Sequence, residues 1–145
     1  MRIFLFFFII STLSQAQAIK LGQFDEIKVF DGIRLTIIPS GADSLVVEGK
    51  NKSFLSIKNK NGRLYIRMDL KKRLSGFNTN VALFSSNILE VIDANEGSFV
   101  SCQDVLFQPS ITLKAQEGAE IDATLDVQKV KTKTNSGGII TLKGA

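Results

Sequence analysis

The chain has 145 residues, with 18 lysines and arginines against 14 acidic residues and a net charge of +4. It contains no histidine and one cysteine, Cys102. These counts exclude serine–histidine catalytic triads, most zinc sites and a disulfide within the chain.

The first 18 residues have the layout of a secretory signal peptide. Arg2 gives a basic start, residues 3–10 are an unbroken apolar run, and Ala16-Gln17-Ala18 is a small-x-small cleavage site. The run is shorter than the about 20 apolar residues that a membrane-spanning helix needs. We therefore predict a cleaved signal peptide at residues 1–18 and an exported mature domain at residues 19–145. Its expected location is the periplasm, the outer-membrane surface or the extracellular space.

Residues 24–69 alternate apolar and polar side chains between turn signals, which is typical of β-strands. The turns are marked by Asp31-Gly32, Pro39-Ser40-Gly41 and Asn61-Gly62, of which the last is the strongest hairpin signal. We expect residues 19–75 to form an antiparallel sheet, with hairpins at these turns, that caps one end of the fold. The charged and flexible run at residues 71–76 marks the junction with the rest of the chain.

Residues 76–145 contain one short pattern three times, centred on Gly97, Gly118 and Gly137. A period of about 20 residues is typical of a solenoid. A corner turned in so few residues needs positive φ, which glycine adopts without strain. The pattern therefore predicts an all-β fold with parallel β-solenoid coils of about 20 residues.

The repeat also makes two predictions about single positions. Cys102 aligns with Ala123 and Leu142, which predicts a buried apolar position for its thiol. After Leu142 only three residues remain, so the last coil is expected to be open. If the chain is complete, this end should join a partner strand or a second copy; if it is a fragment, further coils would cover it.

Several segments in order resemble a known family, namely FDEIKV at 24–29, GIRLTI at 32–37, LVVEG at 45–49 and NGRLYI at 61–66, followed by glycine-centred coils. The chain resembles the auto-transporter adhesin head family, the GIN domain, of bacterial envelopes. The resemblance implies a right-handed parallel β-helix with an antiparallel N-terminal part, an exported location and a role in adhesion, without established catalytic residues. The Gly-Ile-Asn tripeptide that names the domain is absent, and such domains usually continue through further coils.

One acidic cluster could carry chemistry: Glu117, Glu120, Asp122 and Asp126. Paired carboxylates cleave glycosides, with Asp122 and Asp126 as the first candidates for acid and base, and carboxylates also bind calcium. The preferred interpretation is a solvated outer face, because acidic side chains keep a sheet surface soluble.

Basic residues are concentrated in the first half of the chain: Lys50, Lys52, Lys58, Lys60, Arg63, Arg67, Lys71, Lys72 and Arg73. They could attract anionic envelope polymers or lipid head groups, although the preferred interpretation is again a solvated strand surface. With one tyrosine and no tryptophan, the stacking platforms of single-stranded nucleic-acid binders are lacking.

The sequence thus predicts an exported, non-catalytic domain for adhesion or binding at the bacterial cell envelope. No catalytic, cofactor-binding or metal-binding residue is assigned, and no cofactor is expected. The expected partner is a protein or polysaccharide of the envelope or of another surface, not nucleic acid. The alternatives are a polysaccharide-acting enzyme on a β-helix scaffold and a structural module that assembles with itself through the open coil end.

Overall fold

The structure is a computed structural model, and it describes residues 19 and 21–144. The predicted signal peptide lies outside the described residues. None of the helices in the described part of the chain is long and apolar enough to cross a membrane.

Eleven strands and three short 3-10 turns make up the described fold. The strands are β1 (Glu26–Val29), β2 (Arg34–Pro39), β3 (Ser44–Gly49), β4 (Leu55–Lys60), β5 (Arg63–Met68), β6 (Thr79–Ser85), β7 (Val91–Ala94), β8 (Phe99–Cys102), β9 (Leu106–Gln116), β10 (Glu120–Asn135) and β11 (Ile139–Gly144). The 3-10 turns are η1 (Lys52–Phe54), η2 (Leu70–Lys72) and η3 (Gly76–Asn78).

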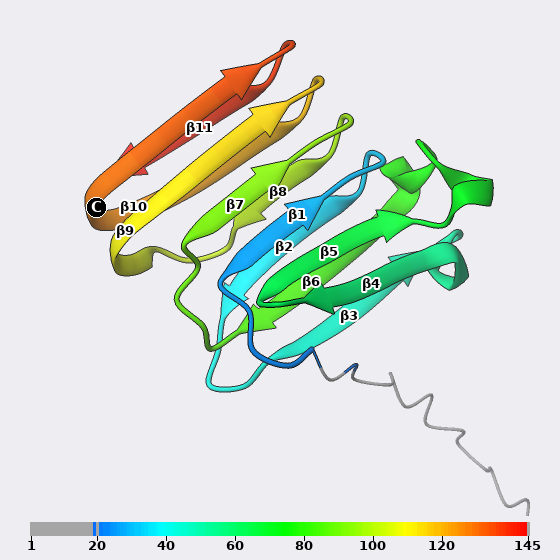
Figure 1. The fold of residues 1–145 in the computed structure, drawn as a ribbon, viewed down its shortest axis with the longest axis horizontal. Helices are drawn as coiled ribbons and strands as arrows, with labels where there is room; N and C mark the ends of the chain where they lie inside the picture. Colours follow the sequence, from blue (N-terminus) through cyan, green and yellow to red (C-terminus); the bar gives the residue numbers. More distant parts are fainter. Residues whose placement is uncertain (1–18, 20, 145) are drawn as a thin grey trace, which may run out of the picture.

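All the strands belong to one sheet, in the order β3-β6-β2-β8-β10-β9-β7-β1-β5-β4, with β11 paired to β10. The pairs β3–β6 and β4–β5 are antiparallel, and the other pairs are parallel. The sheet curls into a half-barrel, so that β1, β5, β7 and β9 face β2, β6, β8 and the first part of β10 (Figure 1).

The prediction of a right-handed parallel β-helix preceded by an antiparallel region is therefore wrong. A helical coil would lie beside the coils before and after it in the chain, whereas β1 lies between β5 and β7, and β2 lies between β6 and β8. The expected hairpin around Asp31-Gly32 is also absent, because β1 and β2 do not pair with each other. The same turn residues can join two paired strands or two strands on facing parts of a curled sheet.

The hairpin predicted at Asn61-Gly62 is confirmed. These two residues join β4 to β5, which pair antiparallel from Lys60 opposite Arg63 to Leu55 opposite Met68. Asn61 and Gly62 have φ values of 51° and 83°, as a type I′ hairpin turn requires.

Four further two-residue turns stack on one another at one end of the strands. The β6–β7 and β8–β9 connections lie at the other end. The four turns are Asp31-Gly32, Glu96-Gly97, Glu117-Gly118 and Ser136-Gly137. Both residues of each turn have positive φ, which confirms the positive φ predicted for the three repeat glycines. The N–H of each of the first three glycines donates to a carbonyl of the next turn, at 2.9 Å from Gly32 to Glu96, 2.9 Å from Gly97 to Glu117 and 3.1 Å from Gly118 to Ser136. The stacked turns thus fix the register of successive layers.

Two rows of apolar side chains form the core between the facing parts of the sheet. The first row runs in register through Ile27, Leu64, Ile92 and Leu113, and the second through Leu35, Val81, Val100 and Ile121. All eight side chains are buried, and burial of each contributes about 1.5–3 kcal/mol. This core makes the outer faces of the sheet rigid.

Cys102 lies at the end of β8, opposite Ile37 of β2, and packs against the core without being fully buried. Ala123, its equivalent in the next layer, is 1% exposed, whereas Leu142 on β11 is 37% exposed. Burial, and secondarily the charge of Asp122, raises the pKa of the Cys102 thiol to about 12. The thiol is therefore protonated at neutral pH.

Candidate functional site

The outer surface formed by β4, β5, β1, β7, β9 and the second half of β10 is strongly basic. On these strands buried apolar residues alternate with outward-facing residues, and residues opposite each other in register share a face. We call this surface the basic face. Its nine cations are Lys28, Lys58, Lys60, Arg63, Arg67, Lys114, Lys129, Lys131 and Lys133.

Two carboxylates lie on the basic face, and both are already paired. Asp93 Oδ2 lies 3.1 Å from the Nζ of Lys28, and Glu26 Oε2 lies 2.7 Å from the Nε of Arg63. Asp93 is 2% exposed and accepts a further hydrogen bond from the side-chain amide of Asn95. The two ion pairs leave most of the positive charge of the face without a counterion.

The outer surface of the remaining strands has a different balance of charge. Its charged side chains in strands are Arg34, Glu48, Glu120, Asp122 and Lys143. This surface therefore has slightly more acidic than basic groups, and the positive charge of the sheet is concentrated on the basic face.

A shallow hollow of about 230 Å³ lies on the basic face above β1, β7, β9 and β10. It is lined by Lys28, Asp93, Lys114, Ala115, Gln116, Lys133 and Asn135. Lys114 and Lys133 lie directly opposite each other. The Gln116 amide is fixed by a 2.6 Å hydrogen bond that it donates to Oδ1 of Asn95. The hollow can receive a small anionic group beside polar hydrogen-bonding partners.

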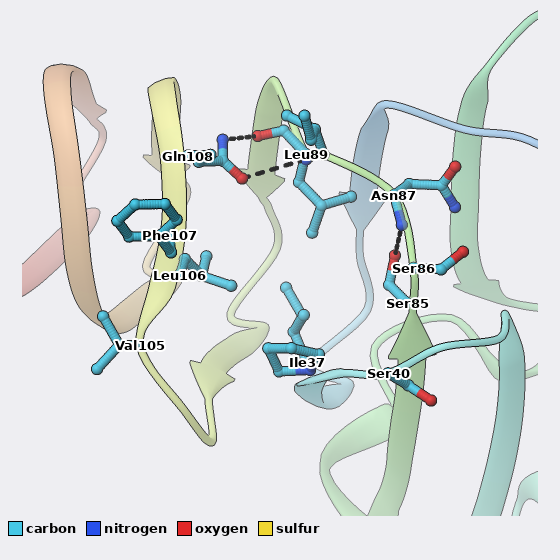
Figure 2. A pocket seen from close by; sticks show the side chains of 12 residues that line it. Ile37, Ser40, Ser85, Ser86, Asn87, Leu89, Val105, Leu106, Phe107 and Gln108 are labelled. Atoms are coloured by element: carbon cyan, nitrogen blue, oxygen red, sulfur yellow. Dashed lines mark hydrogen bonds between the residues drawn. The ribbon is translucent and has the colours of Figure 1, made fainter.

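A second feature, the apolar groove, lies at the end of the sheet away from the stacked turns (Figure 2). The groove consists of two hollows. The first, of about 260 Å³, lies between Ile37, the β6–β7 connection and the start of β9, and the second, of about 480 Å³, lies beside Phe107. Phe107 is 83% exposed and Ile88 is 60% exposed. Gln108 lines both hollows, and its amide donates to the Leu89 carbonyl at 2.7 Å.

The acidic residues suggested by the sequence do not converge. Glu117 lies in a stacked turn, Glu120 and Asp122 point outward from β10, and Asp126 lies further along the same strand. Asp122 is 3.8 Å from Lys143. Asp122 lies in the part of β10 that pairs with β8 and β11, whereas Asp126 lies opposite Phe107, at the start of the part that pairs with β9.

No group of three or more potential metal ligands occurs among the described residues. One carboxylate pair does occur, between Asp31 in the first stacked turn and Glu96 in the second. Asp31 is buried and accepts a 2.9 Å hydrogen bond from the Met68 N–H, which attaches the end of β5 to the turn. Burial, followed by the nearby Asp31 carboxyl, raises the pKa of Glu96. The pair lies in the turn connections, where it has a structural role.

The basic residues suggested by the sequence divide into two groups. Lys58, Lys60, Arg63 and Arg67 belong to the basic face, whereas Lys50, Lys52, Lys71, Lys72 and Arg73 lie in connections. Sequence reasoning missed the five cations that come from β1, β9 and β10. It also missed the apolar groove, for which the outward position of Phe107 in an alternating strand was the available signal.

The fold and its surfaces define an all-β domain that displays charged side chains on a broad face. The model of the family described as "Putative auto-transporter adhesin, head GIN domain" matches residues 23–145, and the chain belongs to this family. No curated protein matches the chain.

Several solved structures are similar in fold. A putative adhesin from Bacteroides fragilis has a TM-score of 0.77 and 18% sequence identity, covering 88% of this chain and 61% of that chain. A putative adhesin from Parabacteroides distasonis has a TM-score of 0.75 and 18% identity, covering 87% and 55%. A putative lipid binding protein from Parabacteroides distasonis has a TM-score of 0.60 and 16% identity, covering 88% and 65%. The chain thus spans less than two thirds of the length of each.

Proposed function

We propose that this domain is a non-catalytic binding module, exported to the bacterial cell envelope, that attaches to material at a surface. The observation that carries the proposal is that charged and polar side chains are spread over broad outer faces of a rigid sheet and do not converge in a cleft. Membership of an adhesin head family and similarity to bacterial putative adhesins support the same function.

Two alternatives to a binding module are an enzyme acting on polysaccharide and a self-assembling structural module. An enzyme acting on polysaccharide would need a pair of cooperating carboxylates. Asp122 and Asp126 lie on parts of β10 that pair with different strands, and Asp122 lies near Lys143, which disfavours the pair that the sequence suggests. A self-assembling module would use β11, which pairs with β10 and exposes 53% of Ile139 and 37% of Leu142. A strictly monomeric mass of residues 19–145 over a range of concentrations would count against self-assembly.

The test uses residues 19–145 immobilised on beads and a panel of envelope polysaccharides, host glycans and matrix proteins. We expect retention of at least one component, with no release of reducing sugar from the polysaccharides of the panel. Release of sugar would support the enzyme alternative, and retention of no component would contradict the proposal. Export is tested separately by N-terminal sequencing of protein recovered from the envelope fraction, where a chain that still begins at Met1 would contradict cleavage after Ala18.

A further inference from the structure

We propose that the basic face binds an acidic polysaccharide, as an extended chain with carboxylate or sulfate groups on successive sugars. This inference rests on the proposed binding function and adds the chemical class of the ligand and the surface that receives it. Three observations carry it: uncompensated charge, regular spacing and the absence of exposed apolar side chains on the face.

The first observation is that most cations of the face lack a counterion. Among the described residues, no carboxylate lies within 4.0 Å of the ammonium groups of Lys58, Lys60, Lys114, Lys129, Lys131 and Lys133. Lys133 lies directly opposite Lys114, and Arg63 directly opposite Lys60. Like charges in directly opposite positions are destabilising, and a bound polyanion would relieve this repulsion.

The second observation is that the cations form a regular array. Lys129, Lys131 and Lys133 follow one another at every second residue of β10, about 6.6 Å apart. Neighbouring strands are about 4.8 Å apart. One row across six strands has cations at four positions, with Tyr65 and Asp93 at the other two; in order it runs Lys58, Tyr65, Lys28, Asp93, Lys114 and Lys133. A chain with charges at regular intervals can contact several lysines at once.

The polar hollow on the face suits a sugar unit of such a chain. Lys114 and Lys133 stand on its sides, and the amides of Gln116 and Asn135 lie beside them. An acidic group can lie between the two ammonium groups while the amides bond to hydroxyls. Lysine ammonium groups are point charges on flexible side chains, so they can adjust to the positions of the acidic groups along the polymer.

The third observation favours a polysaccharide over a membrane. The exposed large apolar side chains of the described chain lie outside the basic face: Ile19, Leu70, Leu74, Phe77, Ile88, Val105, Phe107, Val130, Ile139 and Leu142. Val130 belongs to the inward-facing row of β10, opposite Ile111. On the face itself, the Phe30 ring is covered by Arg67 at 4.9 Å and the Tyr65 ring by Lys60 at 5.9 Å. Proteins that lie on a membrane usually insert apolar side chains between the lipids.

The experiment measures the affinity of residues 19–145 for polygalacturonate, heparin, neutral dextran and phosphatidylglycerol-containing vesicles at two salt concentrations. The face variant is Lys129→Glu/Lys131→Glu/Lys133→Glu. Its matched control is Lys50→Glu/Lys71→Glu/Arg73→Glu, which changes the net charge equally at exposed positions outside the face. A second face variant, Lys58→Glu/Lys60→Glu, tests another strand, and circular dichroism verifies that each variant folds.

We expect binding to at least one of the two acidic polysaccharides, no binding to dextran, and a strong decrease in affinity as salt rises, because exposed charges are screened. The first face variant should lose at least about tenfold in affinity and the control less than about threefold, since only the former removes direct contacts. Equal losses in both variants would overturn the inference, as would vesicle binding without polysaccharide binding. Retention of a neutral component of the earlier panel, unaffected by the face variants, would overturn this inference alone and leave the binding function intact.

Discussion

At the scale of single residues, Cys102 offers a test of how closely the two facing parts of the sheet pack. Burial raises the pKa of its thiol to about 12, from an ordinary value near 9.0. Because only the thiolate reacts rapidly, alkylation at pH 8 should be more than about tenfold slower in the native protein than in denaturant. Equal rates would show that the thiol lies in solvent.

The same shift predicts a dependence of stability on pH. The folded-state pKa is higher than the unfolded one, so this contribution to stability is fully present below about pH 9 and is lost as the pH rises toward 12. Denaturant unfolding at pH 8 and pH 10 measures the loss. A Cys102→Ala control removes the part of the pH dependence that is due to this thiol and leaves the part due to lysines. If the free energy of unfolding fell equally with pH in the two proteins, the raised pKa of Cys102 would be contradicted.

At the scale of elements, the stacked turns show two different reasons why a position requires glycine. Gly118 has φ +73° and open space where a Cβ would lie, so Gly118→Ala should cost about 1–2 kcal/mol through backbone strain alone. At Gly138, an added Cβ would lie 1.9 Å from the Ala115 carbonyl oxygen. Gly138→Ala should therefore cost more than Gly118→Ala, because backbone must move.

Thermal unfolding of both variants measures this difference. The two neighbouring glycines serve different needs, because Gly137 has φ +79° and Gly138 allows close approach to Ala115. A Gly138→Ala protein that is as stable as Gly118→Ala would mean that the last stacked turn is loosely attached.

The strands and turns themselves were accessible from the sequence. Alternation identifies the inward positions of β1, β2 and β5, and the period of the glycines identifies three of the four stacked turns. Positive φ at Glu96, Glu117 and Ser136 was not accessible, because residues other than glycine rarely adopt it. Asp31-Gly32 was assigned to a hairpin, since its residue types suit either kind of connection.

At the scale of the molecule, the order of strands could not be predicted. Alternation shows which side chains are buried but not which strand lies beside which, and the insertion of β1 between β5 and β7 leaves no local signal. The basic face was only partly predicted for the same reason. Lys58 and Lys60 are close in sequence to Arg63, whereas Lys114 and Lys133 join them only through the strand order.

This strand order predicts how the molecule unfolds. In a solenoid each coil contacts only its neighbours in the chain, so terminal coils can unfold separately. Here β1 and β2 come first in the chain but lie in the interior of the sheet. β1 lies between β5 and β7, and β2 lies between β6 and β8. Loss of β1 and β2 would remove one neighbour from each of these four strands. We therefore expect a single cooperative transition through the whole domain.

Two probes lie on opposite sides of β1 and β2: the fluorescence of Tyr65 on β5 and the reactivity of Cys102 on β8. Their denaturant midpoints should coincide with that of the far-ultraviolet circular dichroism. Ile37→Ala, at a 1% exposed position of β2, should lower stability by about 2–5 kcal/mol and move both midpoints equally. Ile38→Ala is the matched control, since Ile38 faces outward on the same strand, and it should cost less. Separate midpoints for Tyr65 and Cys102, or a shift of one alone in Ile37→Ala, would show that the two sides of the sheet fold independently.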